Sequence, residues 1–219
     1  MKTYEVTVEY YDDNETVYDV IVRETWHLNG VIHRDDGPAI IEHDQDSGQI
    51  CTEEYYHNGE LHRLVGPAIK TYDKIDDEIR VSSEEWWVNG KRHRLEGPAS
   101  WEKRNYEDVV TSEDWYVDGV KHREDGPALL ARFAETNQVY REEWYQRGKL
   151  HRTDGPAVIE RDIDSGSVIK EKWLQNDVLH RDVGPAMIKK DPHTGLVITE
   201  EFYRWGEPAA KGQLHEPNL

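Results

Sequence analysis

Residues 84–99 read EEWWVNGKRHRLEGPA, and six further segments of the 219-residue chain repeat this pattern in whole or in part. An aromatic residue leads each copy: Trp26, Tyr55, Trp86, Trp115, Trp144, Trp173 and Phe202. These leading aromatics are separated by 29, 31, 29, 29, 29 and 29 residues. A fixed period of this kind marks a repeat architecture, in which each unit packs mainly against its neighbours. The chain therefore consists of seven related units.

Each unit carries the signals of a β-hairpin. A β-branched residue lies five positions before every leading aromatic, as Val81 does before Trp86. Three positions after the aromatic comes a dipeptide that suits a two-residue turn, where both residues take positive φ. We predict such turns at Asn29-Gly30, Asn58-Gly59, Asn89-Gly90, Asp118-Gly119 and Arg147-Gly148, with a weaker signal at Asn176-Asp177. No helical period is sustained, so the predicted fold is all-β: a single-layer, elongated antiparallel meander of repeated hairpins, with about two strands per unit.

A strand-breaking triplet recurs in the units, and the two ends of the chain depart from the repeat. A Gly-Pro-Ala triplet follows the turn in six units, and its proline is expected to interrupt the returning strand, because proline cannot donate to a sheet ladder. Residues 1–23 lack the repeat signature and are predicted to form a capping hairpin. Residues 24–199 hold six repeats, and residues 200–219 a degenerate seventh repeat and a tail.

A histidine stands opposite each leading aromatic if the turn has two residues, because such a turn fixes the cross-strand register. A glutamate two residues before the aromatic lies on the same face, diagonal to the histidine. We interpret the three side chains as a structural cluster with a carboxylate near the ring. The predicted clusters are Trp86, His93 and Glu84; Trp115, His122 and Glu113; and Trp144, His151 and Glu142.

The arginine after each histidine points to the opposite face, across from the residue just before the leading aromatic. That residue is acidic in four units, so ion pairs are predicted for Arg63, Arg94, Arg123 and Arg152 with Glu54, Glu85, Asp114 and Glu143. Exposed pairs of this kind are worth ~0.2–1 kcal/mol each.

A second aromatic follows the leading one in most units and faces the other side of the sheet. These residues are the candidates for contact with a partner, because large aromatic side chains often anchor interfaces. The alternative is that they pack against the β-branched row and against Leu61, Leu150 or Leu179. The candidates are Tyr56, Trp87, Tyr116, Tyr145 and Tyr203.

The pattern of the repeated histidines argues against a catalytic or metal-binding role. A histidine with a glutamate can act as a general base, but no serine or cysteine nucleophile accompanies each copy. Equivalent histidines should lie two strands apart, about 9–10 Å, which is too far for one metal ion to bridge. We expect no catalytic residues, no metal and no cofactor, and hence no enzyme.

Composition limits the partners. Lys and Arg total 27 against 45 Asp and Glu, which gives a net charge of −18. Such a surface repels phosphate, so direct binding to nucleic acid or to an anionic membrane is not expected, whereas a basic protein surface fits. Solubility alone is the alternative reason for the charge. The N-terminus has no apolar signal core and Cys51 is the only cysteine, so the expected location is cytoplasmic.

The unit W-Y-x-N-G-x-x-H-R-x-D-G-P-A resembles the MORN-type repeat in its variant form, over residues 24 to about 209. Proteins with such repeats occur in bacteria, phages and large DNA viruses, and some resemble antitoxins. The resemblance implies a single-layer sheet of hairpins and a role in protein interaction. An acidic inhibitor or antitoxin at a basic site is the leading hypothesis, a structural or self-assembling scaffold the second, and a hydrolase a distant third. The oligomeric state and the binding face stay open.

Overall fold

The computed structural model describes residues 2–11, 20–75, 78–104 and 109–211. Strands and turns make up this part of the chain, which contains no helix. Accordingly, the described residues offer no helical segment with the length and apolar character that crossing a membrane requires. The prediction of an all-β antiparallel meander is confirmed.

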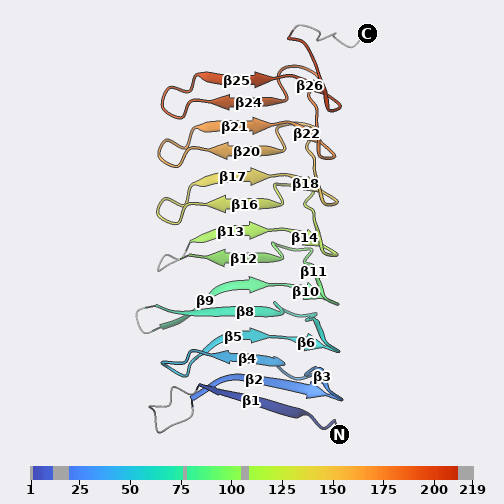
Figure 1. Ribbon diagram of the computed structural model, residues 1–219, viewed down its shortest axis with the longest axis vertical. Coiled ribbons are helices and arrows are strands. Elements are labelled where there is room, and N and C mark those ends of the chain that lie inside the picture. The colour runs from blue at the N-terminus through green and yellow to red at the C-terminus, as the bar shows by residue number, and fades with distance from the viewer. Residues whose placement is uncertain (1, 12–19, 76–77, 105–108, 212–219) are drawn as a thin grey trace.

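The long strands form one continuous antiparallel sheet. Each inner strand pairs with the long strand before it and the long strand after it, so the strands follow one another in chain order from β1 to β25 (Figure 1). They are β1 (Glu5–Tyr11), β2 (Val20–Leu28), β4 (Ile40–His43), β5 (Ile50–Glu54), β8 (Ile69–Ile75), β9 (Glu78–Glu85), β12 (Ser100–Lys103), β13 (Val110–Asp114), β16 (Leu129–Arg132), β17 (Val139–Glu143), β20 (Val158–Arg161), β21 (Val168–Lys172), β24 (Met187–Lys190) and β25 (Val197–Glu201).

Short hairpins project from one end of this sheet, on the right in Figure 1. The first is made by the end of β2 with β3 (Val31–Ile32), and the other six are separate two-stranded ladders. Their strands are β6 (Tyr56–His57), β7 (Glu60–Leu61), β10 (Trp87–Val88), β11 (Lys91–Arg92), β14 (Tyr116–Val117), β15 (Val120–Lys121), β18 (Tyr145–Gln146), β19 (Lys149–Leu150), β22 (Leu174–Gln175), β23 (Val178–Leu179), β26 (Tyr203–Arg204) and β27 (Glu207–Pro208). The main sheet thus has about two long strands per unit, as expected, and each unit adds a short two-stranded hairpin that was not expected as a separate ladder.

The turns of the short hairpins have the predicted backbone. Asn89 and Gly90 have φ of 49° and 69°, and the five predicted turns all have positive φ at both residues. The weak Asn176-Asp177 turn does too, at 53° and 69°. This left-handed conformation is why Asn, Asp and Gly dominate these positions.

The leading aromatic marks the point where the chain leaves the main sheet. The N–H of Tyr55 donates to the carbonyl of Ala68 at 2.7 Å, and its own carbonyl accepts the N–H of His62 at 2.9 Å. The second bond recurs between Trp86 and His93 at 2.9 Å, which confirms the predicted cross-strand pairing. Because both backbone groups are satisfied there, the strand can end without a buried unpaired amide.

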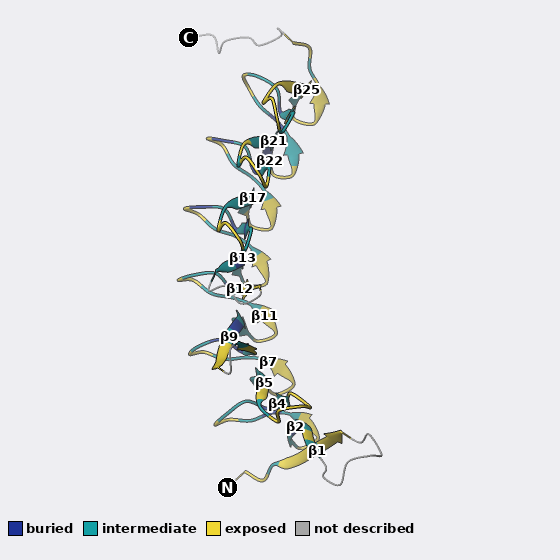
Figure 2. Cartoon of the chain, turned by 90° about the vertical axis from the view of Figure 1, so that its left-hand side faces the viewer, coloured by how far each residue is buried: buried dark blue, intermediate teal, exposed yellow. Residues whose placement is uncertain are grey.

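The alanine of each Gly-Pro-Ala triplet is the best-buried residue type in the structure. Ala39, Ala68, Ala99, Ala128, Ala157 and Ala186 are all 0% exposed. Each joins two units: Ala99 accepts the N–H of Trp86 and donates its own N–H to the carbonyl of Asp114, at 2.7 and 2.8 Å. Figure 2 shows how little else is fully buried in this thin fold.

The triplet interrupts the short hairpin's return as predicted, but the shift in sheet register lies further on. Register shifts recur inside the strand after the triplet, for example between Glu102 and Lys103 and between Ala131 and Arg132. The triplet itself is part of a loop that carries the chain from the short hairpin back into the main sheet.

We predict that Ala99→Leu lowers the free energy of unfolding by about 1–3 kcal/mol, because the extra methylene groups have no space between adjacent units. Urea denaturation followed by tryptophan fluorescence measures the change. The exposed Ala210 gives the matched control, and Ala210→Leu should stay within ~0.5 kcal/mol of the parent. Equal stability of Ala99→Leu and the parent would contradict the packing described above.

Candidate functional site

The seven-residue loop from histidine to alanine, here called the HR loop, occurs in six units: 33–39, 62–68, 93–99, 122–128, 151–157 and 180–186. Its arginine lies flat on the leading aromatic of the same unit. The guanidinium carbon is 3.6 Å from the ring centre of Trp86 at Arg94, and between 3.8 and 4.1 Å in the other five units. The stack is a cation–π contact. Because tyrosine replaces tryptophan in the second unit, the ring face rather than the indole N–H is what matters.

The same arginine closes the HR loop. A guanidinium nitrogen donates to the proline carbonyl four residues later, as in Arg94 to Pro98 at 3.1 Å. The glycine between them lies under the guanidinium: a Cβ on Gly126 would be 2.7 Å from the Arg123 guanidinium carbon, and one on Gly97 would be 2.8 Å from that of Arg94. A side chain at this position would push the arginine off its ring. At Gly126, which has no positive φ, space alone explains the glycine. Gly97 has a positive φ as well, which itself favours glycine.

The ion pairs predicted for these arginines are therefore wrong. Arg94 and Arg63 lie on aromatic rings, and Arg123 and Arg152 pair with Asp125 and Asp154 of their own loops, at 3.0 and 2.9 Å. The expected acidic partners are used elsewhere. Glu85 binds Arg92 at 3.0 Å, Asp114 binds Lys121 at 2.6 Å, and Glu143 binds Arg141. Each of these acids does bind a cation, but that cation belongs to the short hairpin (Arg92 and Lys121) or lies two residues earlier in the same strand (Arg141).

The histidine of each HR loop binds the next unit. Its Nδ1 accepts the backbone N–H of a turn residue in the following short hairpin, at 3.0 to 3.3 Å. The six bonds run from Asn58 to His33, Asn89 to His62, Asp118 to His93, Arg147 to His122, Asn176 to His151 and Trp205 to His180. An accepting Nδ1 leaves the proton of the neutral ring on Nε2. Sequence spacing could not reveal this role, because the partner is 25 or 27 residues away.

The predicted carboxylate on the histidine ring is a second error. Glu84 accepts the indole N–H of Trp101 at 3.1 Å, Glu113 binds Arg132 at 2.6 Å, and Glu142 binds Arg161 at 2.5 Å. In each case the partner lies on the next long strand, 17 or 19 residues further on. The glutamate row thus ties adjacent long strands, whereas the histidine row ties adjacent units.

The second aromatics form a half-buried ladder along the short hairpins. The guanidinium of Arg92 lies 5.2 Å from the ring of Trp87 and 5.7 Å from that of Tyr116, so one cation bridges two units. Lys121 repeats this between Tyr116 and Tyr145, at 5.7 and 5.5 Å. Partner contact through these rings stays a prediction, because structural partners already occupy much of their surface.

The polar ends of the second aromatics are also engaged. Tyr145 donates to Glu143 at 3.0 Å and Tyr203 donates to Glu201 at 3.3 Å. Burial, and then the charge of Glu143, raises the pKa of Tyr145 to about 12. The pKa of Tyr56 is raised to about 12 by burial and by Glu54. Both phenols are therefore neutral hydrogen-bond donors at physiological pH.

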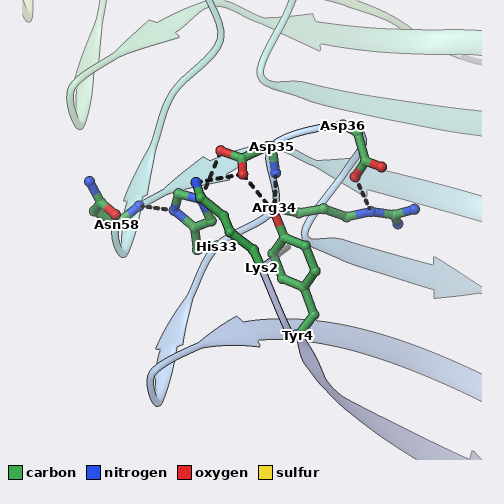
Figure 3. Close-up of polar contacts among 7 residues, drawn as sticks. All are labelled: Lys2, Tyr4, His33, Arg34, Asp35, Asp36 and Asn58. Carbon is green, nitrogen blue, oxygen red and sulfur yellow. Dashed lines mark hydrogen bonds and ion pairs between the residues drawn. The ribbon is translucent and has the colours of Figure 1, made fainter.

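The first HR loop is fastened to the N-terminal cap (Figure 3). Asp35 accepts hydrogen bonds from the ammonium of Lys2 at 2.6 Å and from the hydroxyl of Tyr4 at 2.8 Å. It also lies 3.0 Å from Nε2 of His33, which is 2% exposed. The hydrogen bond from Lys2, followed by that from Tyr4, holds the pKa of Asp35 well below its usual range.

Within the described residues, one group has ligand atoms close enough to hold a metal ion: His33, Asp35 and His57, all within 4.8 Å of one another. Both nitrogens of His33 are occupied, since Nδ1 accepts from Asn58 and the Nε2 proton faces Asp35. A metal on Nε2 would move the ring proton to Nδ1. Nδ1 could then no longer accept the N–H of Asn58, and the hydrogen bond between units 1 and 2 would be lost. The ammonium of Lys2 on Asp35 opposes a cation further. These contacts fit a structural network better than a metal site.

The two residues between arginine and glycine, here called the loop tip, are exposed in all six units. The tips are Asp35-Asp36, Leu64-Val65, Leu95-Glu96, Glu124-Asp125, Thr153-Asp154 and Asp182-Val183. Among them, Glu124 is 91% exposed and Leu64 80%. Every flanking residue is the same in the six copies, whereas the tip differs in each. Sequence reasoning overlooked this surface, although that contrast between fixed flanks and changing tips was visible.

Hollows lie between successive HR loops. The groove between units 1 and 2 has a volume of about 630 Å³ and is walled by Asp35 and Asp36 on one side and by Leu64 and Val65 on the other. The groove between units 3 and 4 has a volume of about 670 Å³, with Leu95 on one wall and Glu124 and Asp125 on the other. The stacked arginines form part of both linings.

Comparison with known proteins found no matching family model, no matching curated protein and no matching solved structure.

We predict that His33→Leu lowers the free energy of unfolding by about 1–3 kcal/mol, because it leaves the Asn58 N–H without its buried acceptor. His33→Asn should recover part of the loss, since its amide oxygen can take the place of Nδ1. The exposed His193 provides the control, and His193→Leu should leave stability unchanged. Chemical denaturation measures all three variants. Equal stability of the Leu and Asn variants would argue against the inter-unit bond.

A second prediction concerns the glycine under the arginine. Gly126→Ala should destabilise the fold by about 1–2 kcal/mol, because its methyl group displaces Arg123 from Trp115 and from the Pro127 carbonyl. In an Arg123→Ala background the same glycine change should cost little, since the displaced group is already gone. A double-mutant cycle on unfolding free energies gives the coupling. Additive effects of the two changes would show that the guanidinium does not impose the glycine.

Proposed function

We propose that the chain is a non-enzymatic protein-interaction ribbon whose loop tips form the recognition surface. One observation carries this proposal: the residues shared by the six HR loops have structural partners, and the two exposed positions that vary do not share one. The histidine joins units, the arginine stacks, the glycine makes room and the alanine is buried. A repeat array commonly presents changing side chains on such a fixed frame to bind a partner.

Charge supports a basic partner. The net charge is −18, and seven of the twelve tip residues are acidic, five of them aspartate and two glutamate. Other acids have partners within the sheet: Glu113 and Glu142 form ion pairs with Arg132 and Arg161, and Glu84 accepts a hydrogen bond from Trp101. The exposed tips are therefore better placed than the glutamate row to meet a basic surface. An acidic inhibitor or antitoxin that fills a basic site of its target is the specific role this charge supports.

We also propose that the repeats are of the MORN type and that the protein is cytoplasmic. A MORN-type origin agrees with the hairpin units, and a cytoplasmic location agrees with the single cysteine, Cys51, which lacks an intrachain partner for a disulfide.

A scaffold that assembles with itself is the second candidate. The last long strand, β25, pairs on one side only, and Leu196, Val197 and Ile198 at this edge are 69, 49 and 65% exposed. Open apolar edges invite pairing with another chain. The charge of −18 opposes that association, so a mass that rises with salt would favour the scaffold.

Capture from the native host tests the proposed function. The bait is the whole chain, and a second bait carries amides at the acidic tips: Asp36, Glu96, Glu124, Asp125, Asp154 and Asp182. A matched control carries amides at six exposed acids elsewhere: Glu5, Glu9, Asp46, Glu135, Asp164 and Glu207. We expect the parent and the control to capture the same basic protein, with an association rate that falls as salt rises. The tip variant should associate more slowly by about tenfold or more.

A partner that binds all three baits equally would exclude the tips as the recognition surface. A captured protein whose affinity does not depend on salt would point to the aromatic ladder instead.

A further inference from the structure

We propose that the tips of units 1 to 4 bind a segment of the partner in which two basic side chains flank apolar ones. This inference rests on the proposed function and adds to it the chemistry of the bound segment. It follows from the order of the tips along the ribbon: acidic at unit 1, apolar at unit 2, leucine beside glutamate at unit 3, and acidic at unit 4.

The centre of this surface is apolar and fully presented to solvent. Leu64, Val65 and Leu95 are 80, 84 and 72% exposed, and they stand on neighbouring HR loops. Apolar side chains that protrude together from a rigid loop row mark an interaction site more than a packing need. Nothing in the HR loop itself requires them, because the tips of units 1, 4 and 5 hold only Asp, Glu or Thr in the same backbone positions.

The flanks carry the charge. The HR loop of unit 4 holds two carboxylates, Glu124 and Asp125, against the guanidinium of Arg123. In unit 1 the ammonium of Lys2 binds Asp35, so Asp36, at 80% exposure, is the acid presented to a partner. The guanidinium of Arg123 is mostly covered by its ring contact, at 20% exposure, whereas Glu124 and Asp125 are 91 and 83% exposed. The most exposed charged side chain at each flank is therefore a carboxylate: Asp36 at 80% exposure, against 24% for Arg34 and 53% for Lys2, and Glu124 at 91%.

Each flanking groove suits a lysine or arginine side chain. Such a side chain has an apolar stem and a charged head, and it binds best where one wall is apolar and the other acidic. The groove between units 1 and 2 sets Leu64 and Val65 against Asp36. The groove between units 3 and 4 sets Leu95, with Glu96 beside it, against Glu124 and Asp125, so in each groove an apolar side chain faces a carboxylate.

Spacing defines the segment further. Neighbouring units are two strands apart, ~9.6 Å, so the two grooves lie ~19 Å apart. An extended peptide rises ~3.3 Å per residue and covers that distance in about six residues. Residues six apart in a strand point to the same side. The partner segment should thus have basic residues at positions i and i+6, with apolar residues at i+2 and i+4 facing the central tips.

A labelled peptide, KSLSLSK, is the probe, and fluorescence anisotropy with the full chain is the measurement. The controls are a peptide of the same composition with adjacent lysines, SKKLLSS, and a peptide without the apolar residues, KSSSSSK. We expect KSLSLSK to bind about tenfold more tightly than either control. The protein variant Leu64→Ser with Leu95→Ser should lose that preference, whereas Leu196→Ser with Ile198→Ser, two exposed residues just before and within β25, should keep it.

If the three peptides bind equally and the Leu64 and Leu95 changes have no effect, the segment inference is overturned while a charge-driven basic partner remains. If none of the peptides binds even at low salt, both the inference and the preference for basic partners fail. Loss of the preference in both double variants would also overturn it, because the effect would then not belong to the central tips.

Discussion

The stack of an arginine on the leading aromatic of its own unit is the contact on which the rest of the repeat depends. It holds the HR loop against the end of the main sheet, and its guanidinium also caps the proline carbonyl. At Gly126 and Gly155 that side chain explains why a glycine precedes the proline, since the guanidinium occupies the space that a Cβ would fill. Gly66, Gly97 and Gly184 also have a positive φ, which itself favours glycine. The loop then delivers the alanine into a position with no room for a larger residue. Four of the recurring residues thus follow from one interaction.

Neighbouring units are joined by a different set of bonds. The histidine Nδ1 receives the next turn's N–H, the alanine bridges two strands of the main sheet, and the glutamate row ties long strands together. A fold with so small a buried core depends on these regular polar contacts, because apolar burial alone gives little to a single layer. The array ends where they cease. In the seventh unit Ala209 stands at the histidine position, still bonded to Phe202 but with no ring to receive a further turn.

The recurring residues of each unit hold the fold together, whereas the loop tips are exposed, and this difference links the architecture to the proposed function. The frame consists of the long strands and the recurring residues of the HR loops. Its glutamates before the leading aromatic already bind Trp101, Arg132 and Arg161, so they are not free to bind a partner. The tips have no structural role in common: Asp125 and Asp154 pair with the arginine of their own loop and Asp35 with Lys2, and the residue types change from one unit to the next. A rigid row of loops at regular steps suits an extended or loop-shaped basic surface, and it limits the entropy lost on binding because the loops are already fixed.

The sequence alone determined the repeat, its period, the all-β class, the turn positions and the pairing of each leading aromatic with its histidine, because these depend on short-range patterns that a two-residue turn makes rigid. It could not assign the partners of the long polar side chains. Arg94 reaches a ring rather than Glu85, and His62 reaches the turn at Asn89, since flexible side chains choose among neighbours that only the stacking of units brings close. The same holds for the loop tips: their letters were visible in the chain, but tertiary structure decided that they stand exposed in a row, with grooves between them.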